Sequence, residues 1–281
     1  MPSAVALHVS AHPDDEALGA PGALHLLRRD GWAVVNVIVS LGRPPDQDRR
    51  RAEAVAAGRR AGYEVRVLEP PIELSRTGDQ VSAVRKISRE LTRLIADIEP
   101  TVLISPSPHD RHHGHEAVGR AVEAALRTGT GRPRQPWWWM WGVWADLPFP
   151  NLYVALAEED MAGILYCLDC YEGELRRNDY RRYLPSRDAA NVVLGSERVF
   201  GFGSPRVSDA PYAELLTSVR LCDGRWLGAS PAVFSSTLPD RPSGLDLTSW
   251  IVAPSARELV LAPDDRAESS PERKRAKRLG A

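Results

Sequence analysis

The chain has 281 residues, of which 43 % are hydrophobic, so it can bury a large core in one domain or at most two. Acidic and basic residues nearly cancel to a formal net charge of −1, which gives no electrostatic case for nucleic-acid binding. Three cysteines, Cys167, Cys170 and Cys222, do not make a disulfide framework and favour a reducing compartment. The partner expected from these numbers is a small to medium-sized molecule.

No basic segment followed by a long apolar stretch opens the sequence. No later run reaches the roughly 18 to 20 apolar residues that cross a bilayer. These patterns predict a soluble, cytoplasmic protein without a membrane partner, and they favour no particular oligomeric state.

The first half of the chain alternates strand-like and helix-like segments. The expected strands cover residues 4–10, 33–40, 64–68 and 101–105, and the expected helices cover 16–29, 44–61 and 79–98. Four strands with three helices between them predict an α/β fold, with a largely parallel, doubly wound sheet and helices on both faces.

The second half is less regular and predicts a smaller, β-containing part of the same domain. Its expected elements are a Trp-rich strand near 137–145, a strand at 152–156, a helix at 158–183 and β-like pieces at 197–202 and 218–227. Residues 1–263 are therefore expected to form one domain. Residues 264–281 contain almost no large apolar side chain, which is typical of a disordered charged tail.

Three loops of the first half are expected to meet at one edge of the sheet. They follow the first, second and fourth strands and cover residues 12–16, 41–43 and 106–115. In open parallel sheets the ligand lies outside the carboxyl ends of the strands, where such loops gather. Residues about a hundred positions apart can therefore share one pocket, and Arg43 is a candidate for contact with the ligand.

Two of these loops are rich in metal-ligand side chains. The first contains His12-Pro-Asp14-Asp15-Glu16, and the last holds four of the seven histidines, between His109 and His115. A catalytic zinc commonly takes three ligands from His, Asp and Glu and leaves its fourth position to water. An alternative is that Asp14 or Asp15 caps the following helix, but capping explains one acid and not the histidine cluster.

His12-Pro-Asp-Asp-Glu16 after a first strand, with Asp110-x-His112-x-x-His115 after a later one, resembles the zinc-dependent N-acetylglucosaminyl deacetylase family, the LmbE-like or PIG-L family. The similarity runs from residue 4 to about residue 205. It implies a Rossmann-like fold and one Zn²⁺ per chain. The metal ligands that it implies are His12, Asp15 and His115.

The same resemblance implies that Asp14 is the general base and His112 the general acid or oxyanion partner. Zinc lowers the pKa of bound water from about 15.7 towards 7, which supplies a nucleophile at neutral pH. Asp14 would take the proton and pass it to the leaving amine. We expect Asp110 to hold His112 in the required tautomer.

The second motif departs from the family pattern. The family commonly has His-Pro-Asp-His where this sequence has His112-His113-Gly114-His115. The missing acid at Gly114 leaves open what orients the third ligand, and His113 remains an alternative to His115. Arg50 and Glu53 match a family Arg-x-x-Glu pattern near the substrate sugar, and a surface ion pair explains them equally well.

Trp137 to Trp144 carries five of the eight tryptophans. In a strand, Trp137, Trp139 and Trp141 share one face, so Trp139 and Trp141 are candidates for stacking on a substrate, with burial in the core as the alternative. This aromatic surface, with His8 to Pro13 and Gly195 to Gly203, is similar to deacetylases of glycopeptide-antibiotic biosynthesis, which act on a glycosylated pseudoaglycone.

Three other functions stay open from the sequence. One is deacetylation of a small N-acetylglucosaminyl glycoside in thiol biosynthesis, and another is a sugar-binding module that has lost turnover. Retention of Asp14 and His112 argues against a pure binding module, which needs neither. A metallophosphoesterase would need a two-metal cluster with more carboxylates than these loops provide.

Overall fold

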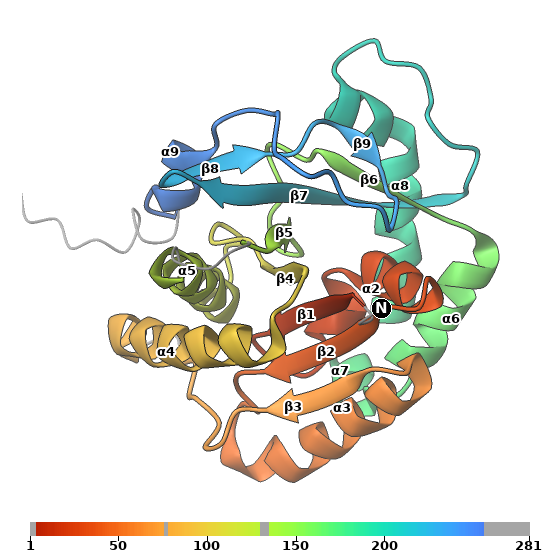
Figure 1. Ribbon diagram of the computed structural model, residues 1–281. Coiled ribbons are helices and arrows are strands. Elements are labelled where there is room, and N and C mark those ends of the chain that lie inside the picture. Colours follow the sequence, from red (N-terminus) through yellow and green to blue (C-terminus); the bar gives the residue numbers. More distant parts are fainter. Residues whose placement is uncertain (1–3, 76–77, 130–134, 256–281) are drawn as a thin grey trace, which may run out of the picture.

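The computed structural model describes residues 4–75, 78–129 and 135–255. A nine-stranded sheet runs through this part of the chain, in the order β3-β2-β1-β4-β5-β7-β6-β9, with β8 paired to β7 (Figure 1). The first five strands in this order are parallel, whereas β5 pairs with β7, and β7 with β6, in antiparallel fashion. The predicted α/β fold with a largely parallel, Rossmann-like sheet is confirmed.

The strands of the first half lie where the apolar runs predict them. The bounds of the strands are β1 Val5–Ser10, β2 Ala33–Ile38, β3 Glu64–Val67, β4 Val102–Pro106, β5 Trp137–Trp141, β6 Leu152–Leu156, β7 Tyr212–Cys222, β8 Arg225–Gly228 and β9 Ala232–Val233. The chain adds β2 and β3 on one side of β1 and then returns to add β4 and β5 on the other side, so the topological switch point lies between β1 and β4. The loops after β1 and β4 therefore flank the crevice where such sheets bind ligands.

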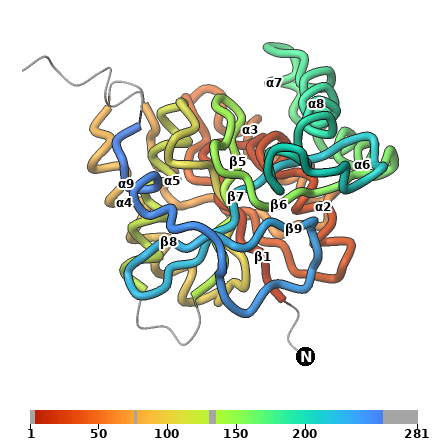
Figure 2. Tube along the Cα trace, turned by 90° about the horizontal axis from the view of Figure 1, so that it is seen from above, coloured from red at the N-terminus to blue at the C-terminus, as the bar shows by residue number. Residues whose placement is uncertain are grey.

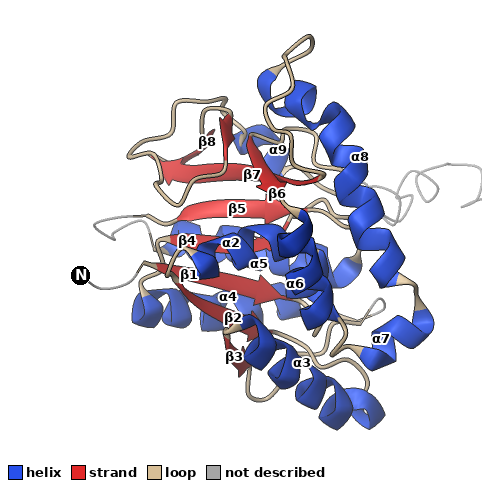
Figure 3. Ribbon diagram, turned by 90° about the vertical axis from the view of Figure 1, so that its right-hand side faces the viewer, coloured by secondary structure: helices blue, strands red, loops and turns tan. Residues whose placement is uncertain are grey.

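Helices cover both faces of the sheet. Their bounds are α1 Asp15–Leu18, α2 Pro21–Arg29, α3 Gln47–Ala61 after the short 3₁₀ turn η1 Pro44–Asp46, α4 Gln80–Ile98, α5 His113–Thr128, α6 Glu158–Leu168, α7 Glu172–Arg177, α8 Tyr180–Phe200 and α9 Thr248–Val252. Figure 2 shows α4, α5 and α9 on one side of the molecule and α6, α7 and α8 on the other. Figure 3 shows α7 and the start of α8 near the edge towards which the parallel strands point.

Two apolar clusters fill the space between the sheet and its helices. One joins Leu7 and Leu103 to side chains of α4 and α5, and the other joins Ala6 and Ile104 to side chains of α2 and α6. Because neighbouring residues of a strand point to opposite faces, each buried strand contributes to both clusters. This two-sided burial explains why the strands read as continuous apolar runs in the sequence.

The tryptophan strand follows the predicted alternation but is buried on both faces. Trp138 and Met140 belong to the cluster with α4 and α5, whereas Trp137, Trp139 and Trp141 belong to the cluster on the opposite face. The exposed fractions of these five side chains lie between 0 and 2 %. The core interpretation of this strand is therefore correct, and neither face is open.

Two predicted elements are wrong in the second half. The single helix expected over residues 158–183 is divided into α6, α7 and the start of α8, because the chain turns at Tyr171, whose ring is buried against Ile38 and Ala54. The β-like piece at 197–202 is the end of α8, where Val199 packs on Tyr153. In both places tertiary contacts outweigh local propensity.

The helix expected over residues 16–29 is also interrupted. Pro21 begins α2 because it has no N–H group for a preceding turn, and Gly19 lies against the Trp141 ring. A Cβ atom on Gly19 would come within 2.4 Å of that ring. Close approach of β5 therefore fixes the break between α1 and α2.

Among the described helices, none is both long enough and apolar enough to cross a bilayer. The charged tail predicted for residues 264–281, together with the boundary at 263, lies outside the described residues.

Candidate active site

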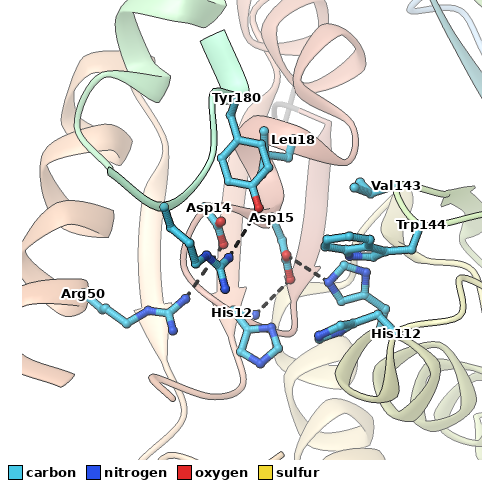
Figure 4. A pocket seen from close by; sticks show the side chains of 11 residues that line it. His12, Asp14, Asp15, Leu18, Arg50, His112, Val143, Trp144 and Tyr180 are labelled. Atoms are coloured by element: carbon cyan, nitrogen blue, oxygen red, sulfur yellow. Dashed lines mark hydrogen bonds and ion pairs between the residues drawn. The ribbon is translucent and has the colours of Figure 1, made fainter. Parts of the chain in front are cut away.

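A cleft opens at the carboxyl edge of the sheet, beside β1 and β4. Its volume is about 120 Å³, and it is partly open to solvent. Residues of both halves of the chain line it: His12, Asp14, Asp15, Leu18, Arg50, His112, His115, Val143, Trp144, Arg177 and Tyr180. Figure 4 shows Arg50, Asp14 and Tyr180 on one side of the cleft and His112 and Trp144 on the other, with Asp15 between them.

The loop after β1 directs two carboxylates into the cleft instead of capping α1. Asp14 precedes α1 with a positive φ of 102° and makes no capping hydrogen bond. The Oδ2 atom of Asp15 accepts the N–H of His12 at 2.9 Å, which folds the loop back on itself. A positive φ at a non-glycine residue costs of order 1–3 kcal/mol and is concentrated at functional sites. The capping alternative is therefore wrong.

Three histidines meet at the base of the cleft. Ring nitrogens of His12, His112 and His115 all lie within 4.8 Å of one another. His115 is held from both sides: its Nδ1 atom is 2.6 Å from Oδ2 of Asp110, and its Nε2 atom is 3.2 Å from Oδ1 of Asp15. Both carboxylates are buried. His115 and the residues that were predicted with it thus come together, although they lie on different loops.

The contacts of His115 fit a bound cation. When Nδ1 donates its proton to Asp110, Nε2 of the neutral ring is an acceptor that faces a carboxylate oxygen, so a proton or a metal ion must lie between them. Two ligands bound about 2.0 Å from a tetrahedral zinc lie about 3.3 Å apart, close to the separation of His115 and Asp15. The Nδ1 atom of His112, which is buried, has no hydrogen-bond partner in the described part of the chain. The donor set therefore fits a metal ion.

Asp110 contacts a different histidine from the one we predicted. It bonds His115 and not His112, so it fixes the tautomer of the third expected ligand. This contact answers the question that Gly114 raises, because the carboxylate that orients His115 comes from five residues earlier. A Cβ atom on Gly114 would lie 2.7 Å from Cε1 of His12, so glycine makes room for the His12 ring.

The other two histidines of the loop make contacts elsewhere. Nε2 of His109 lies 2.6 Å from the carbonyl oxygen of Trp250. Nε2 of His113 lies 3.0 Å from the carbonyl oxygen of Leu74. His113 is therefore placed to bind the backbone and not a metal ion, and the geometry favours His115 as the third donor.

Electrostatics separates the roles of Asp14 and His112. Burial, with the carboxylates of Asp15 and Glu174, raises the pKa of Asp14 well above its usual value, while Arg50 opposes the shift. Asp14 is thus a carboxylate that takes up a proton readily. Burial and the neighbouring imidazoles lower the pKa of His112 to about 3, which favours its neutral form. A neutral ring suits hydrogen bonding or metal binding better than the protonated state we expected.

The remaining histidine and acid of the first motif are also held by charge. Burial lowers the pKa of His12 to about 3, so the ring is neutral and can bind a cation. Burial lowers the pKa of His115, but the Asp15 charge and the two carboxylate hydrogen bonds outweigh this and raise it to about 10. These opposite shifts place one positive centre, a proton or a metal ion, beside Asp15.

A cluster of charges forms the wall opposite the histidines. Glu174 of α7 is buried, and its oxygens lie 3.3 Å from Nη2 of Arg50 and 2.8 Å from Nη2 of Arg177. Arg50 also approaches Asp14 at 4.0 Å. Arg50 is therefore at the cleft, whereas Glu53 bonds Arg49 instead. No sequence signal marks Glu174, Arg177 or Tyr180, because they lie in a segment with no distinctive spacing.

The three residues assigned to substrate contact lie away from the cleft. The side chain of Arg43 is 87 % exposed and pairs with Asp46 at 3.3 Å. Trp139 is buried near Phe234, and Trp141 is buried between Gly19 and the His115 ring. Trp141 therefore supports the site from below. The tryptophan that lines the cleft is Trp144, three positions further along.

Glu16 is buried beneath the cleft and accepts a hydrogen bond from the hydroxyl of Tyr171. Burial raises the pKa of Glu16 to about 7. No hydrogen bond joins Glu16 to a histidine within the part of the chain that is described. Its contact anchors the turn between α6 and α7 to α1.

Solved structures with this fold include both deacetylases and a hydratase. The pseudoaglycone deacetylase Dbv21 of antimicrobial reagent A40926 is 20 % identical, with a TM-score of 0.58 over 81 % of this chain and 98 % of its own. N,N′-diacetylchitobiose deacetylase from Pyrococcus horikoshii is 16 % identical, with a TM-score of 0.53 over 77 and 84 %. GalB, the 4-carboxy-2-hydroxymuconate hydratase from Pseudomonas putida, is 22 % identical, with a TM-score of 0.57 over 76 and 95 %.

At these identities the likenesses show a common fold. No curated protein matches the chain in sequence. The model of the PIG-L family, described as GlcNAc-PI de-N-acetylase, matches residues 7–126, which contain both motifs of the cleft. Over these residues the chain is similar to the PIG-L family, as its two motifs predict.

Proposed function

We propose that this protein is a zinc-dependent hydrolase that removes the N-acetyl group from an N-acetylglucosaminyl conjugate. The observation that carries the proposal is the position of His115 between two buried carboxylates, with Asp14 at the same cleft and outside those contacts. One group of side chains is arranged to hold a cation, and a separate carboxylate is free to move a proton. The relatives of known fold include deacetylases of amino sugars and of glycopeptides.

The residues that would hold the metal are His12, Asp15 and His115, with one Zn²⁺ per chain. His112 is a further donor at the same place, because its buried Nδ1 atom has no partner among the described residues. A zinc ion bound there would polarise the amide carbonyl and lower the pKa of its water towards about 7.

Asp14 acts as the general base and then as the general acid. It takes a proton from the attacking water as the new carbon–oxygen bond forms, and it returns that proton to the nitrogen as the carbon–nitrogen bond breaks. The products are acetate and a free amine on the sugar. The raised pKa of Asp14 favours this exchange, and the positive charge of Arg50 opposes the shift.

His112 would stabilise the oxyanion that forms on the carbonyl. In its neutral form it can donate one hydrogen bond to that oxygen, since one ring nitrogen carries a proton. Within the described residues, the hydrogen bond of Asp110 to a histidine goes to His115 and fixes the tautomer of that ring. Of the two roles that the motif implies for His112, the oxyanion partner is therefore the one we propose.

For the substrate, we propose a glycosylated pseudoaglycone of a glycopeptide antibiotic. Support comes from the fold shared with Dbv21. A small N-acetylglucosaminyl glycoside is the second candidate, because the cleft is small, with a volume of about 120 Å³. All three cysteines are unpaired, which supports action in a reducing compartment such as the cytoplasm.

The experiment that tests this function is mass spectrometry of three candidate substrates after incubation with zinc-loaded protein. They are an N-acetylglucosaminyl pseudoaglycone, free N-acetylglucosamine and its inositol glycoside. Loss of acetyl from the pseudoaglycone alone supports the complete proposal. Loss only from a small glycoside keeps the reaction and rejects the glycopeptide. No loss from any of them, with zinc bound, favours a sugar-binding protein without turnover.

A further inference from the structure

Trp144 differs from the other aromatic residues around the cleft because it is open to solvent. Its side chain is 54 % exposed and lines the cleft, whereas Trp141 beneath it is fully buried. The indole plane lies within 23° of the His112 plane, with ring centroids 6.0 Å apart (Figure 4). A group that reaches His112 therefore comes beside the indole.

A specific backbone turn holds Trp144 in this position. The Oδ1 atom of Asp110 accepts three backbone N–H groups, from Val143, Trp144 and Ala145, at 2.7, 2.9 and 3.1 Å. Gly142 starts the turn, and a Cβ atom there would lie 2.2 Å from the carbonyl oxygen of Ala145. The other oxygen of Asp110 bonds His115. One carboxylate thus fixes both the expected metal ligand and the turn that presents the indole.

The two sides of the cleft have complementary chemistry. Trp144, with Val143 beside it, offers apolar surface, whereas Asp14 and Arg50 lie on the polar side (Figure 4). A pyranose ring has the same asymmetry, with C–H groups on its faces and hydroxyl groups around its edge. Aromatic rings bind flat apolar faces, and a few polar groups fix orientation.

We propose that Trp144 is a specificity-determining residue that stacks on the C–H face of the acetamido sugar, and that Asp110 positions it. This inference rests on the proposed function. The sugar is chosen over a distant aglycone because its ring is joined directly to the amide nitrogen, and the indole adjoins His112, where that amide would react. The structure thus assigns sugar recognition to the turn at 142–145.

The test uses methyl N-acetylglucosaminide, which has no aromatic aglycone. We expect Trp144→Ala to raise KM about tenfold and change kcat by less than about twofold, because loss of about 1.4 kcal/mol of ground-state binding is tenfold in affinity. Trp144→Phe should recover most of the loss. The control is Phe149→Ala, since Phe149 is 41 % exposed in the same loop and does not line the cleft.

Equilibrium binding of the same glycoside to zinc-loaded protein, by calorimetry, separates this inference from the proposed function. If the wild type binds the glycoside without deacetylating it, a tenfold weaker Kd in Trp144→Ala still supports the stacking site. The deacetylase itself is rejected only if the pseudoaglycone also keeps its acetyl group. Unchanged KM and Kd in Trp144→Ala, with circular dichroism showing an intact fold, overturn the inference. An equal loss in Phe149→Ala overturns it as well, because the effect would then belong to the loop as a whole.

Discussion

The floor and the outer wall of the cleft are built in different ways. The floor comes from the loops after β1 and β4, and Asp15 and His115 are buried there and bonded to each other. The outer wall comes from the β5–β6 loop and from α7, and the side chains of Trp144 and Arg177 are more than half exposed. Buried, fixed groups suit the reacting atoms, whereas exposed groups can vary with the substrate.

Two buried carboxylates join the two regions. Asp110 bonds His115 of the floor and the turn that carries Trp144 of the wall. Glu174 bonds Arg50, which adjoins Asp14, and Arg177 on the exposed side. The floor and the outer wall therefore differ in exposure but are connected by buried carboxylates. Variants at these positions test whether the two regions act independently.

The largest effect is expected for Asp14→Asn, which changes the floor alone. Loss of the base should lower kcat about 10³-fold with KM nearly unchanged, since general acid–base catalysis contributes about 10²–10⁴-fold. Elemental analysis should still find one zinc per chain. Asp48→Asn, on the exposed part of α3, is the matched control. Full activity in Asp14→Asn would show that another group moves the proton.

Asp110→Asn should impair the floor of the cleft while leaving the outer wall intact. The amide oxygen can still accept the N–H groups of the turn, whereas the amide nitrogen would face Nδ1 of His115 as a second donor. Metal affinity should fall about 10- to 100-fold, as is typical for partners of metal-binding histidines, with KM at saturating zinc little changed. Asp110→Ala should raise KM as well. If both variants change KM equally, Asp110 does not act on the two regions separately.

Glu174→Gln should show the coupling of the wall to the floor as a shift in pH dependence. Because the Glu174 charge raises the pKa of Asp14, its removal lowers that pKa. A base with a lower pKa is deprotonated at lower pH, so the acidic limb of the kcat/KM profile should move to lower pH. KM should change a few-fold as Arg50 and Arg177 reorient. An acidic limb that stays in place would mean that Asp14 does not set it.

The smallest effect on activity is expected for His8→Gln, which changes a support of the floor. His8 accepts the indole N–H of Trp141 at 3.2 Å and lies 2.9 Å from Oδ1 of Asn36. Burial lowers its pKa from 6.5 to about 4. Between pH 4 and 6.5, His8 binds a proton in the unfolded chain but not in the folded protein. The contribution of neutral His8 to the free energy of unfolding is therefore complete above about pH 6.5 and falls by about 3 kcal/mol as the pH drops to 4.

The variant should therefore be less stable at neutral pH by about 2 kcal/mol but lose less stability on acidification. Urea unfolding at several pH values measures how the free energy of unfolding depends on pH in the wild type and in the variant. The difference between the two pH dependences isolates the contribution of His8. Parallel slopes would show that other groups cause the acid sensitivity. KM for the glycoside should match the wild type, because His8 lies outside the cleft.

The regular half of the fold could be predicted because its signals are local. The apolar runs of β1, β2 and β4 are buried on both faces, and Gly62 and Asp79 mark the end of α3 and the start of α4 with a left-handed residue and a side-chain cap. Prediction failed from 158 to 202, where the turn at Tyr171 and the burial of Val199 depend on contacts with distant strands. Local propensity contains no information about such contacts.

The sequence by itself determined the chemistry of the floor, since His12, Asp14, Asp15 and His115 stand in motifs whose order places them at the ends of neighbouring strands. Only the tertiary structure decided which histidine Asp110 holds, that Trp139 and Trp141 are buried, and that Trp144, Glu174 and Arg177 reach the cleft. The physical reason is that ligand type follows from residue identity, whereas exposure and partner depend on how a loop turns and what packs against it.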